Sequence, residues 1–299
     1  MDQPHNAPQR RARLVPRGND DRLEIVKTGH RKYLIGDMYI RLIAAPWKKL
    51  LVAIVLFYLC SNTLFALGYL LIGDGIENAR PGSLADAFFF SVDTMSTIGY
   101  GNMAPRGLAA NFLVTLQVLT AFIFFAVVTG LVFSKFSRPT ARVMFSNVAV
   151  ICPYDGVPHL MLRLANERGN RIVDANIHLT LLRKETSLEG QQMRRFHDLS
   201  LVRTRLPILQ LSWTVMHRID EHSPLHHVTQ QSLRDVDAEI IVSLTGVDET
   251  LMQTIHARFS YIADDILCNS TFVDIIDRSQ DGRLDVNYTL FHDVRKLES

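Results

Sequence analysis

Two long apolar runs dominate the first half of the chain. Residues 50–73 form a stretch of 24 residues without a charged side chain, and residues 108–134 form a second stretch of 27. A helix of roughly 20 residues is long enough to cross the hydrocarbon core of a bilayer. The buried core helix of a soluble protein is the alternative, but such helices rarely stay uncharged over this length. The pattern therefore predicts two membrane helices, at 48–72 and 108–136.

A third apolar segment lies between the two runs. Residues 84–95 read LADAFFFSVDTM and follow Ser83, whose side chain is suited to cap the first turn of a helix. The segment is too short to cross a bilayer. We expect a short re-entrant helix that leads into the stretch TMSTIGYGN at 94–102, so that this helix and the following loop occupy 84–102.

The chain before the first run divides into a polar part and an amphipathic part. Residues 1–35 are rich in Pro, Arg and Asn and show no apolar period, so they are predicted to form a disordered basic tail. Within 37–46, apolar residues recur at spacings of three and four. We expect a short helix that lies along the membrane surface, with Trp47 as its anchor. The alternative is that this segment is simply the start of the first membrane helix.

The second half of the chain has a different period. After Pro139, short segments alternate apolar and polar residues, as at Leu160, Leu162 and Leu164 in the stretch HLMLRLANE. Turn signals such as Asp-Gly and Glu-Gly separate these segments. Many short alternating strands of this kind are typical of a β-sandwich, which we expect over 139–299.

The distribution of charge orients the predicted membrane segments. Residues 1–49 carry eleven Lys or Arg against five Asp or Glu, whereas the loop at 74–107 contains only two basic residues. Segments rich in Lys and Arg stay in the cytoplasm, so both termini are expected there and the loop outside. Residues 137–299 carry 18 basic and 21 acidic residues, and this balance gives no reason to expect a nucleic-acid partner.

The stretch TIGYG suggests a specific chemistry. Irregular backbone at membrane depth persists only where protein buries it or where it lines an aqueous path. Glycines permit positive φ, and residues of alternating handedness turn successive carbonyl oxygens to one side. Four copies of such a strand around an axis would form rings of oxygen atoms able to replace the hydration shell of K⁺. The predicted selectivity filter consists of Thr97, Ile98, Gly99, Tyr100 and Gly101.

One chain cannot close such rings, so the stretch predicts a homotetramer that conducts K⁺. A tight turn in an outer loop is the alternative for this segment. The rival function, from another class, is a membrane-tethered sensory or ligand-binding protein whose pore is vestigial.

No arrangement of residues in the sequence indicates catalysis or a bound cofactor. None of the eleven histidines stands at a metal-ligand spacing with cysteine or carboxylate, and no nucleophile triad or phosphate-binding loop occurs. Residues 277–285 imitate the first nine positions of an EF-hand calcium loop, but Tyr288 occupies the position of the bidentate Glu. We therefore expect a β-turn there, and the chain is not expected to be an enzyme.

Several stretches of the chain together resemble one known family. The pore loop and the second apolar run look like those of potassium channels with two membrane helices per subunit. The stretches SRPTARVMFSNVAVI, EGQQMRRFHDLSLV and SWTVMHRIDEHSPL resemble the bacterial (KirBac) branch of the inward-rectifier family, and the similarity runs from about residue 36 to residue 294. The resemblance implies a homotetramer in a bacterial inner membrane that conducts K⁺ passively. It also implies an immunoglobulin-like cytoplasmic domain whose central opening extends the pore.

The resemblance assigns roles around the filter and in the second membrane helix. Asp93 stands where the family has an acid behind the filter, but Met103 replaces the arginine of the family's bracing ion pair. Phe133 matches the bundle-crossing gate, where bulky side chains close the cytoplasmic mouth by excluding water. Phe125 and Thr129 share its helix face and are assigned to the cavity.

Two further expectations concern this helix. Phe125 stands at the site where strongly rectifying relatives carry an acid, and a phenyl ring offers polyamines or Mg²⁺ no counter-charge. Weak rectification is therefore expected, with Ba²⁺, Mg²⁺ and polyamines as candidate blockers. Gly130 is the expected hinge, because Ala121 replaces the glycine that relatives often have.

The last expectations concern a second constriction and membrane lipids. Gly246, Val247 and Met252 match a cytoplasmic loop that narrows the pore in relatives, although the residues alone predict only a hairpin. A basic cluster near both membrane ends is expected to bind anionic lipid headgroups at about 1 kcal/mol per charge, unless it serves only as a topology signal. The expected lipid-binding residues are Trp47, Lys48, Lys49, Lys135, Arg138 and Arg142.

Overall fold

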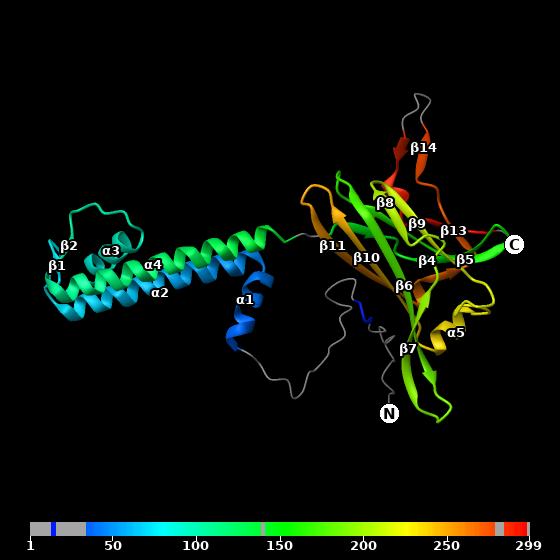
Figure 1. Cartoon of the computed structure of the whole chain (residues 1–299), viewed down its shortest axis with the longest axis horizontal. Helices are drawn as coiled ribbons and strands as arrows, with labels where there is room; N and C mark the ends of the chain where they lie inside the picture. Colours follow the sequence, from blue (N-terminus) through cyan, green and yellow to red (C-terminus); the bar gives the residue numbers. More distant parts are fainter. Residues whose placement is uncertain (1–12, 16–33, 139–140, 279–283, 298–299) are drawn as a thin grey trace, which may run out of the picture. The chain divides into compact units, whose positions relative to one another are not determined.

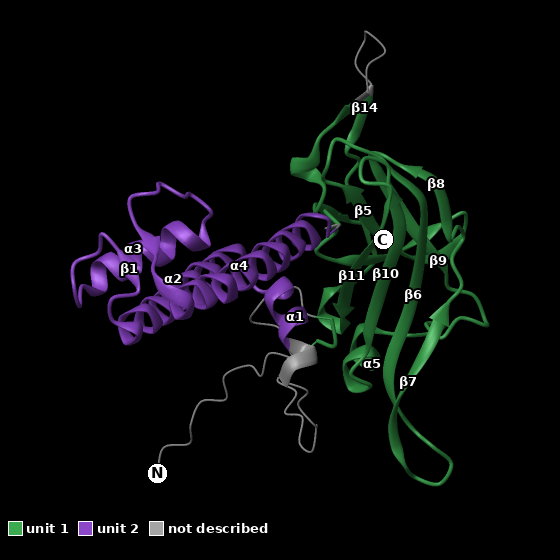
Figure 2. Cartoon of the chain, turned by 60° about the vertical axis from the view of Figure 1, so that its left-hand side comes forward, with its two compact units in different colours: residues 1–26, 139–299 green, residues 27–138 purple. Residues whose placement is uncertain are grey.

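The structure of the chain is a computed structural model that describes residues 13–15, 34–138, 141–278 and 284–297 (Figure 1). The chain divides into two compact units (Figure 2). We call Lys27–Arg138 the helical unit, and Met1–Val26 with Pro139–Ser299 the sandwich unit. The boundary after Arg138 coincides with the change of period in the sequence.

The described part of the helical unit contains the helices α1 (Leu34–Ala44), α2 (Trp47–Ile72), α3 (Leu84–Met95) and α4 (Gly107–Phe136). α2 and α4 run side by side in opposite directions, and α3 packs against both of them (Figure 1). The short strands β1 (Ile76–Glu77) and β2 (Ala104–Pro105) form an antiparallel pair between the helices. Ser83 caps α3, because its Oγ accepts a hydrogen bond from the Asp86 amide at 3.2 Å.

The amphipathic helix α1 differs from the expected range 37–46 at both ends. It begins at Leu34 and ends at Ala44. Pro46 has an extended backbone (φ −61°, ψ 153°) and serves as the N-cap of α2, so it lies outside both helices. Because the residue before a proline is driven away from helical geometry, α1 has to end before Ala45.

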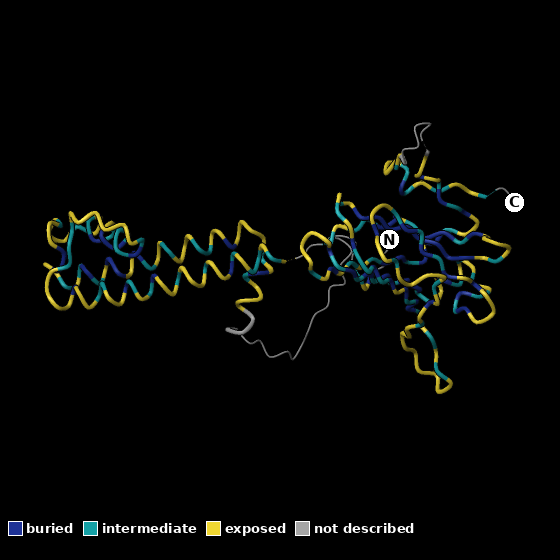
Figure 3. The backbone as a smooth tube through the Cα atoms, turned by 45° about the horizontal axis from the view of Figure 1, so that its top comes forward, coloured by how far each residue is buried: buried dark blue, intermediate teal, exposed yellow. Residues whose placement is uncertain are grey.

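Few residues along α2 and α4 are buried, as the backbone coloured by burial shows (Figure 3), and many of their large apolar residues are exposed. Each helix contains a window of mean hydropathy 2.3, and only 17% of that window is buried. The core helices of soluble proteins are mostly buried, whereas an apolar outer surface is what a bilayer requires. The pattern of burial therefore agrees with two membrane-spanning helices.

Two five-stranded sheets make up most of the described sandwich unit. One sheet has the order β11-β10-β6-β7 with β8 also paired to β6, and the other has the order β12-β4-β5-β3 with β9 also paired to β5. The pairings are antiparallel except that of β12 with β4. The strands are β3 (Val143–Phe145), β4 (Ala149–Tyr154), β5 (Val157–Asn166), β6 (Ile172–Thr186), β7 (Gln192–Leu199), β8 (Arg205–Leu209), β9 (Ser212–Arg218), β10 (Glu239–Asp248), β11 (Gln253–Ile262) and β12 (Ile266–Cys268).

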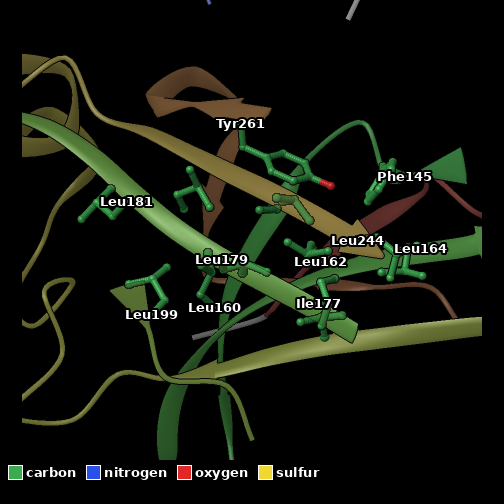
Figure 4. Packing of buried hydrophobic residues seen from close by; sticks show 14 of the residues in the cluster. Phe145, Leu160, Leu162, Leu164, Ile177, Leu179, Leu181, Leu199, Leu244 and Tyr261 are labelled. Atoms are coloured by element: carbon green, nitrogen blue, oxygen red, sulfur yellow. The ribbon is translucent and has the colours of Figure 1, made fainter. Parts of the chain in front are cut away.

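Alternate residues of facing strands form the core between the two sheets (Figure 4). Leu160, Leu162 and Leu164 of β5 are fully buried and belong to one cluster with apolar side chains of β6 and β10. Phe145 of β3 and Tyr261 of β11 belong to the same cluster. The leucines that predicted β5 with a period of two therefore share its inner face, whereas Met161, Arg163 and Ala165 on the opposite face are buried as well. The predicted fold class, apolar helices followed by an all-β sandwich, is confirmed.

Two smaller pairings and a short helix complete the sandwich unit. β13 (Ser270–Phe272) pairs with β16 (Val294–Lys296), β14 (Ile276–Arg278) pairs with β15 (Leu284–Val286), and α5 covers Gln230–Asp235. β14 and β15 border the stretch that imitates a calcium loop, so strands and not an EF-hand helix pair flank it. Its centre, 279–283, lies outside the described residues.

The predicted disordered tail has one described part, residues 13–15, and this part contacts the sandwich unit. Arg13 is 8% exposed and donates a hydrogen bond to Asp265 Oδ2 at 2.8 Å. The Leu14 amide donates to both carboxylate oxygens of Glu239 at 3.0 Å. These contacts depend on residues more than 220 positions away, so composition alone did not reveal them. The other residues of the predicted tail, 1–12 and 16–33, lie outside the described residues.

Candidate ion pathway

The backbone of the predicted filter alternates in handedness. Thr97, Gly99 and Gly101 have φ angles of 55°, 67° and 77°, whereas Ile98 and Tyr100 do not have positive φ. This alternation turns consecutive carbonyl groups towards the same side of the strand. Glycine adopts positive φ without steric cost, but Thr97 does so as a β-branched residue, for which it is rare.

Among the described residues, the backbone hydrogen bonds of the predicted filter to its own chain lie at its beginning. The amides of Thr97 and Ile98 donate to carbonyl oxygens of the last turn of α3 at 3.2 and 3.0 Å. The amides of residues 99–101 have no backbone partner among the described residues of this chain. Tyr100 is 82% exposed, and a Cβ added at either glycine would meet no atom within 4 Å. One copy of the chain therefore leaves this segment uncovered.

Asp93 lies in the last turn of α3 and borders a shallow pocket together with Thr97 and Gly99. Its Oδ1 atom is buried and has no hydrogen-bond partner within the described part of the chain. Met103 lines the same pocket and packs against the apolar cluster of the helical unit, so it supplies no donor. The carboxylate thus lies beside the predicted filter with one buried oxygen that no described residue of the chain satisfies, and such a group is costly to bury.

Phe125, Thr129 and Phe133 lie on one exposed stripe of α4. The exposed fractions of the two phenylalanines are 43% and 70%. Another face of the helix packs on α2, where Phe124 stacks against Phe57 with ring centroids 5.0 Å apart. Side chains four residues apart lie on one helix face, so the stripe is available for contacts outside this chain.

Lys135 makes contacts that charge alone did not predict. Its ammonium donates hydrogen bonds to the carbonyl oxygens of Ile43, at 2.9 Å, and Ala45. It also lies 5.2 Å from the ring centroid of Trp47, whose ring is 4.6 Å from that of Phe136. Two of the six residues expected to bind lipid are therefore occupied in joining α1, α2 and α4.

The other four expected lipid-binding residues are exposed. Lys48, Lys49 and Arg138 belong to the helical unit, and Arg142 belongs to the sandwich unit. Lys48 and Lys49 lie in the first turn of α2, next to the end of α1. Their charges face solvent and are free of the contacts that engage Lys135.

The residues of the expected cytoplasmic constriction lie at the turn between β10 and β11. Gly246 and Val247 are near the end of β10, and Met252 follows it with a φ of 51° and 77% exposure. A Cβ at Gly246 would lie 2.5 Å from Ile172 Cγ2 and 3.3 Å from the carbonyl oxygen of Val173. Glycine at 246 is thus required by the close approach of β6.

Asp248 fixes this turn and was not predicted from the sequence. Its carboxylate accepts hydrogen bonds from the amides of Thr250 and Leu251 at 2.9 and 3.1 Å, and from Asn170 Nδ2 at 2.9 Å. Arg168 lies 3.3 Å away. Burial acts to raise the pKa of Asp248, but these donors outweigh it and hold the pKa below its usual range.

Three buried polar side chains of the helical unit were also not predicted from the sequence as functional residues. Asn62, Ser91 and Gln117 are fully buried in the helical unit. Their presence in otherwise uncharged runs was the available signal, because a polar group inside a membrane protein needs a partner. Among the described residues, no group of three His, Cys, Asp or Glu side chains is placed to hold a metal ion.

Comparisons with known proteins place the chain in a family. Residues 143–299 match the model of the family described as "Inward rectifier potassium channel C-terminal domain", and residues 50–138 match "Ion channel". The chain is 46% identical to the inward rectifier potassium channel Kirbac3.1 of Paramagnetospirillum magnetotacticum, over 96% of this chain and 97% of that protein. It is 30% identical to the ATP-sensitive inward rectifier potassium channel 11 of Homo sapiens, and equally to that of Oryctolagus cuniculus, over 98% of this chain and 80% of each relative. The chain therefore belongs to the inward rectifier potassium channel family, in its prokaryotic branch, and is a membrane channel for K⁺ rather than an enzyme.

Proposed function

We propose that the chain forms a homotetramer in which four filter strands, residues 97–101, surround the path of K⁺. The alternation of positive φ at Thr97, Gly99 and Gly101, in a strand that its own chain leaves uncovered, carries this proposal. Such a strand presents its carbonyl oxygens in one row. Four rows around an axis make stacked rings that replace the hydration shell of K⁺, and the Thr97 hydroxyl adds a ring at the inner end.

The need for partners supports four copies rather than one. In hydrocarbon, each backbone amide or carbonyl without a partner costs several kcal/mol. The amides of residues 99–101 have no backbone partner within the described chain, so acceptors on neighbouring subunits or ordered water must satisfy them, while the carbonyl oxygens are left for the ion. The exposed apolar surface of α4 supplies area for contacts between subunits.

The stripe on α4 supports a gate at the cytoplasmic end of the pore. In the assembly, Phe125, Thr129 and Phe133 face the axis, and four Phe133 rings close the path by excluding water. Gly130 acts as the hinge, because a glycine inside a helix is conformationally freer than other residues, and no neighbouring atom lies within 4 Å of the position of a Cβ there. Phe125 gives Mg²⁺ or polyamines no counter-charge in the cavity, so rectification from this site is weak, while Ba²⁺ blocks at the filter.

The positions of the basic residues support the proposed orientation of the chain in the membrane and a response to anionic lipid. The chain spans a bacterial inner membrane with both termini on the cytoplasmic side. The basic residues flank the ends of α2 and α4 that lead to these termini along the chain, and segments rich in Lys and Arg stay on the cytoplasmic side. The exposed charges of Lys48, Lys49 and Arg138 attract anionic headgroups with about 1 kcal/mol each, and Arg142 adds to them. Lys135 and Trp47 act on the same region by holding α1.

A second constriction lies in the sandwich unit. Four copies of the β10–β11 turn, with Gly246, Val247 and Met252, narrow the cytoplasmic extension of the pore. The exposed Met252 side chain supplies the bulk, and the hydrogen bonds to Asp248 keep the turn in place.

Rubidium uptake into liposomes tests the central proposal. Purified protein is reconstituted with an outward K⁺ gradient, and uptake of ⁸⁶Rb⁺ is measured with and without Ba²⁺ and with Na⁺ in place of K⁺. With the K⁺ gradient we expect ⁸⁶Rb⁺ uptake, and we expect Ba²⁺ to abolish it. With Na⁺ in place of K⁺ we expect no uptake. A monomeric protein, or equal passage of Na⁺ and K⁺, overturns the proposal.

A pair of glycine variants makes this test specific to the filter. Gly99→Ala and Gly82→Ala place a methyl group at similar positive φ values, 67° and 71°, and neither Cβ would meet an atom within 4 Å. Both variants therefore carry similar backbone strain within one chain. We expect Gly99→Ala to abolish uptake and Gly82→Ala to retain it. Equal uptake by the two variants would remove the special role of residue 99.

A further inference from the structure

Four polar side chains are buried inside the helical unit. Asn62, Ser91 and Gln117 have no exposed surface, and Tyr69 is 1% exposed. They belong to three helices: Asn62 and Tyr69 to α2, Ser91 to α3 and Gln117 to α4. Their burial is complete within one chain, so it does not depend on neighbouring subunits. Lipid offers no hydrogen bonds, so these groups have to satisfy one another.

Gln117 is the centre of the resulting network. Its Oε1 accepts a hydrogen bond from the Tyr69 hydroxyl at 2.7 Å, and its Nε2 donates to the Ser91 carbonyl oxygen at 2.8 Å and to Ser91 Oγ at 2.7 Å. Ser91 Oγ in turn donates to Asn62 Oδ1 at 2.9 Å. The amide of Gln117 thus joins α4 to α2 with one hydrogen bond and to α3 with two.

The network continues towards the filter along α2. Asn62 Nδ2 donates to the carbonyl oxygen of Tyr58, and the Tyr58 hydroxyl lies 2.6 Å from Ser96 Oγ. Ser96 is the C-cap of α3 and directly precedes Thr97. α3 is therefore held by directional bonds at Ser91 and again at Ser96, the residue directly before the predicted filter.

Apolar packing alone would not hold α3 in the same way. A leucine or methionine at 117 would fill the space, but apolar contacts tolerate small rotations and sliding of one helix along another. Buried hydrogen bonds have narrow geometry, and a buried polar side chain can fix the register of packed helices. A displacement of α4 relative to α3 would break two of the three bonds of Gln117.

We infer that Gln117 is a positioning residue for the selectivity filter: it fixes α3 against α4, and ion selectivity depends on it although it does not contact the ion path. This inference rests on the proposed filter at 97–101. It goes beyond that proposal, because the geometry of the filter then depends on the side-chain amide of Gln117 in α4. The hydrogen bonds that link this amide to α2 and α3 all lie within one subunit.

The test compares Gln117→Met with Thr115→Val. Gln117→Met keeps length and volume and removes all three hydrogen bonds. Thr115 is exposed on the same helix and bonds only to the Asn111 carbonyl of its own helix, so Thr115→Val also deletes one polar group but leaves α3 untouched. Both variants are reconstituted as full-length tetramers, and ⁸⁶Rb⁺ uptake is measured with K⁺ or Na⁺ as competitor and with a Ba²⁺ series.

We expect Gln117→Met to lower the K⁺ over Na⁺ preference at least fivefold and to shift half-block by Ba²⁺ by a similar factor, per assembled tetramer. Thr115→Val should stay within twofold of the wild type. If a variant only loses stability, the amount of tetramer falls, but the channels that still assemble keep the wild-type preference for K⁺ over Na⁺. Wild-type selectivity in assembled Gln117→Met channels overturns the inference.

Tyr69→Phe and Ser91→Ala keep the test decisive if Gln117→Met fails to assemble. Each removes only hydroxyl contacts of the network and keeps the remaining atoms of its side chain. We expect each to lower the preference for K⁺ in the same direction by a smaller factor, and unchanged ratios in both would refute the role of the network. Absence of K⁺ uptake by the wild type would instead refute the proposed filter, so the two failures are distinguishable.

Discussion

The ammonium group of Lys135 lies 5.2 Å from the ring centroid of Trp47 and donates hydrogen bonds to the carbonyl oxygens of Ile43 and Ala45. These oxygens lie at the end of α1, where a helix carries partial negative charge. A cation over an aromatic ring is attracted to it as well. The last turn of α4 is thereby tied to the surface helix that precedes the membrane.

Replacing Lys135 by Met is expected to release α1. The lost helix-end and cation–π interactions are each worth about 1 kcal/mol. Hydrogen–deuterium exchange of the α1 peptide in the reconstituted channel should become several-fold faster. Lys49→Met, which removes an equal charge from an exposed site, should leave exchange unchanged. Equal acceleration in both variants would mean that net charge, and not the contact with α1, holds the helix.

Replacing Phe133 by Ala is expected to raise ion flux. The smaller side chains widen the apolar constriction and admit water, so ⁸⁶Rb⁺ uptake should increase several-fold. Val127→Ala serves as the control, because Val127 is also exposed, at 54%, and its position two residues from both Phe125 and Thr129 puts it on a different face of α4 from the stripe. If both variants conduct alike, the gate lies elsewhere.

Replacing Asp248 by Asn is expected to destabilise the β10–β11 turn. The single oxygen of asparagine can still accept from Asn170, Thr250 and Leu251, which all bond to Oδ1, but an NH2 group replaces Oδ2 opposite Arg168 and the negative charge is lost, at about 1.5–3 kcal/mol for a hydrogen bond to a charged group. The free energy of unfolding should fall by about 2 kcal/mol in denaturant titrations of the channel. Glu249→Gln is the matched control, because the Glu249 side chain is 48% exposed and its ion pair with Arg171 is long, at 3.7 Å. A wild-type midpoint for Asp248→Asn would contradict this account.

Acidification is expected to destabilise the protein through His217. Burial lowers the pKa of His217, opposed by the Ser200 carbonyl and Asp220 and reinforced by His159. The unfolded imidazole takes up its proton near pH 6.5, whereas the folded one does so only at lower pH. Stability from this group is therefore present above about pH 6.5 and is lost as the pH falls towards the folded pKa.

Melting temperatures measured between pH 7.5 and 5 check this expectation. His217→Gln should flatten the decline, even if it lowers stability at neutral pH by removing the bonds to Ser200 and Ser223. The exposed His178→Gln should keep the wild-type slope. A slope unaffected by His217→Gln would assign the acid sensitivity to other groups.

Arg13 offers a test of the contact between the N-terminal segment and the sandwich unit. Its ion pair with Asp265 is largely buried, with side-chain exposures of 10% and 16%. Removing one partner of a buried pair is expected to cost about 3 kcal/mol, because the other charge stays buried. Arg13→Met with Asp265→Asn should therefore cost less than the sum of the two single changes, measured as shifts in the denaturation midpoint. Strict additivity would show that the two charges do not interact.

Local pattern was sufficient for the long helices, for the strands of the sandwich and for the backbone alternation at 97–101. The uncharged runs determine α2 and α4 because length and hydropathy alone decide whether a helix can span a bilayer. The alternation around Leu162 determines β5, because a strand exposes its faces with a period of two. The glycines at 99 and 101 determine where the backbone can alternate in handedness, since this needs no information from distant residues.

Only the tertiary structure decided which polar groups meet. Gln117 and Ser91 are 26 residues apart, and Lys135 and Ile43 are 92 apart. Whether such side chains touch depends on the rotation and sliding of packed helices, and a change of one residue in register would separate them. Hydropathy is an average over a segment and is insensitive to that register. The sequence by itself therefore determined the two long apolar helices, the alternating strands and where the backbone at 97–101 changes handedness, whereas the hydrogen bonds that hold these elements in position were decided by packing.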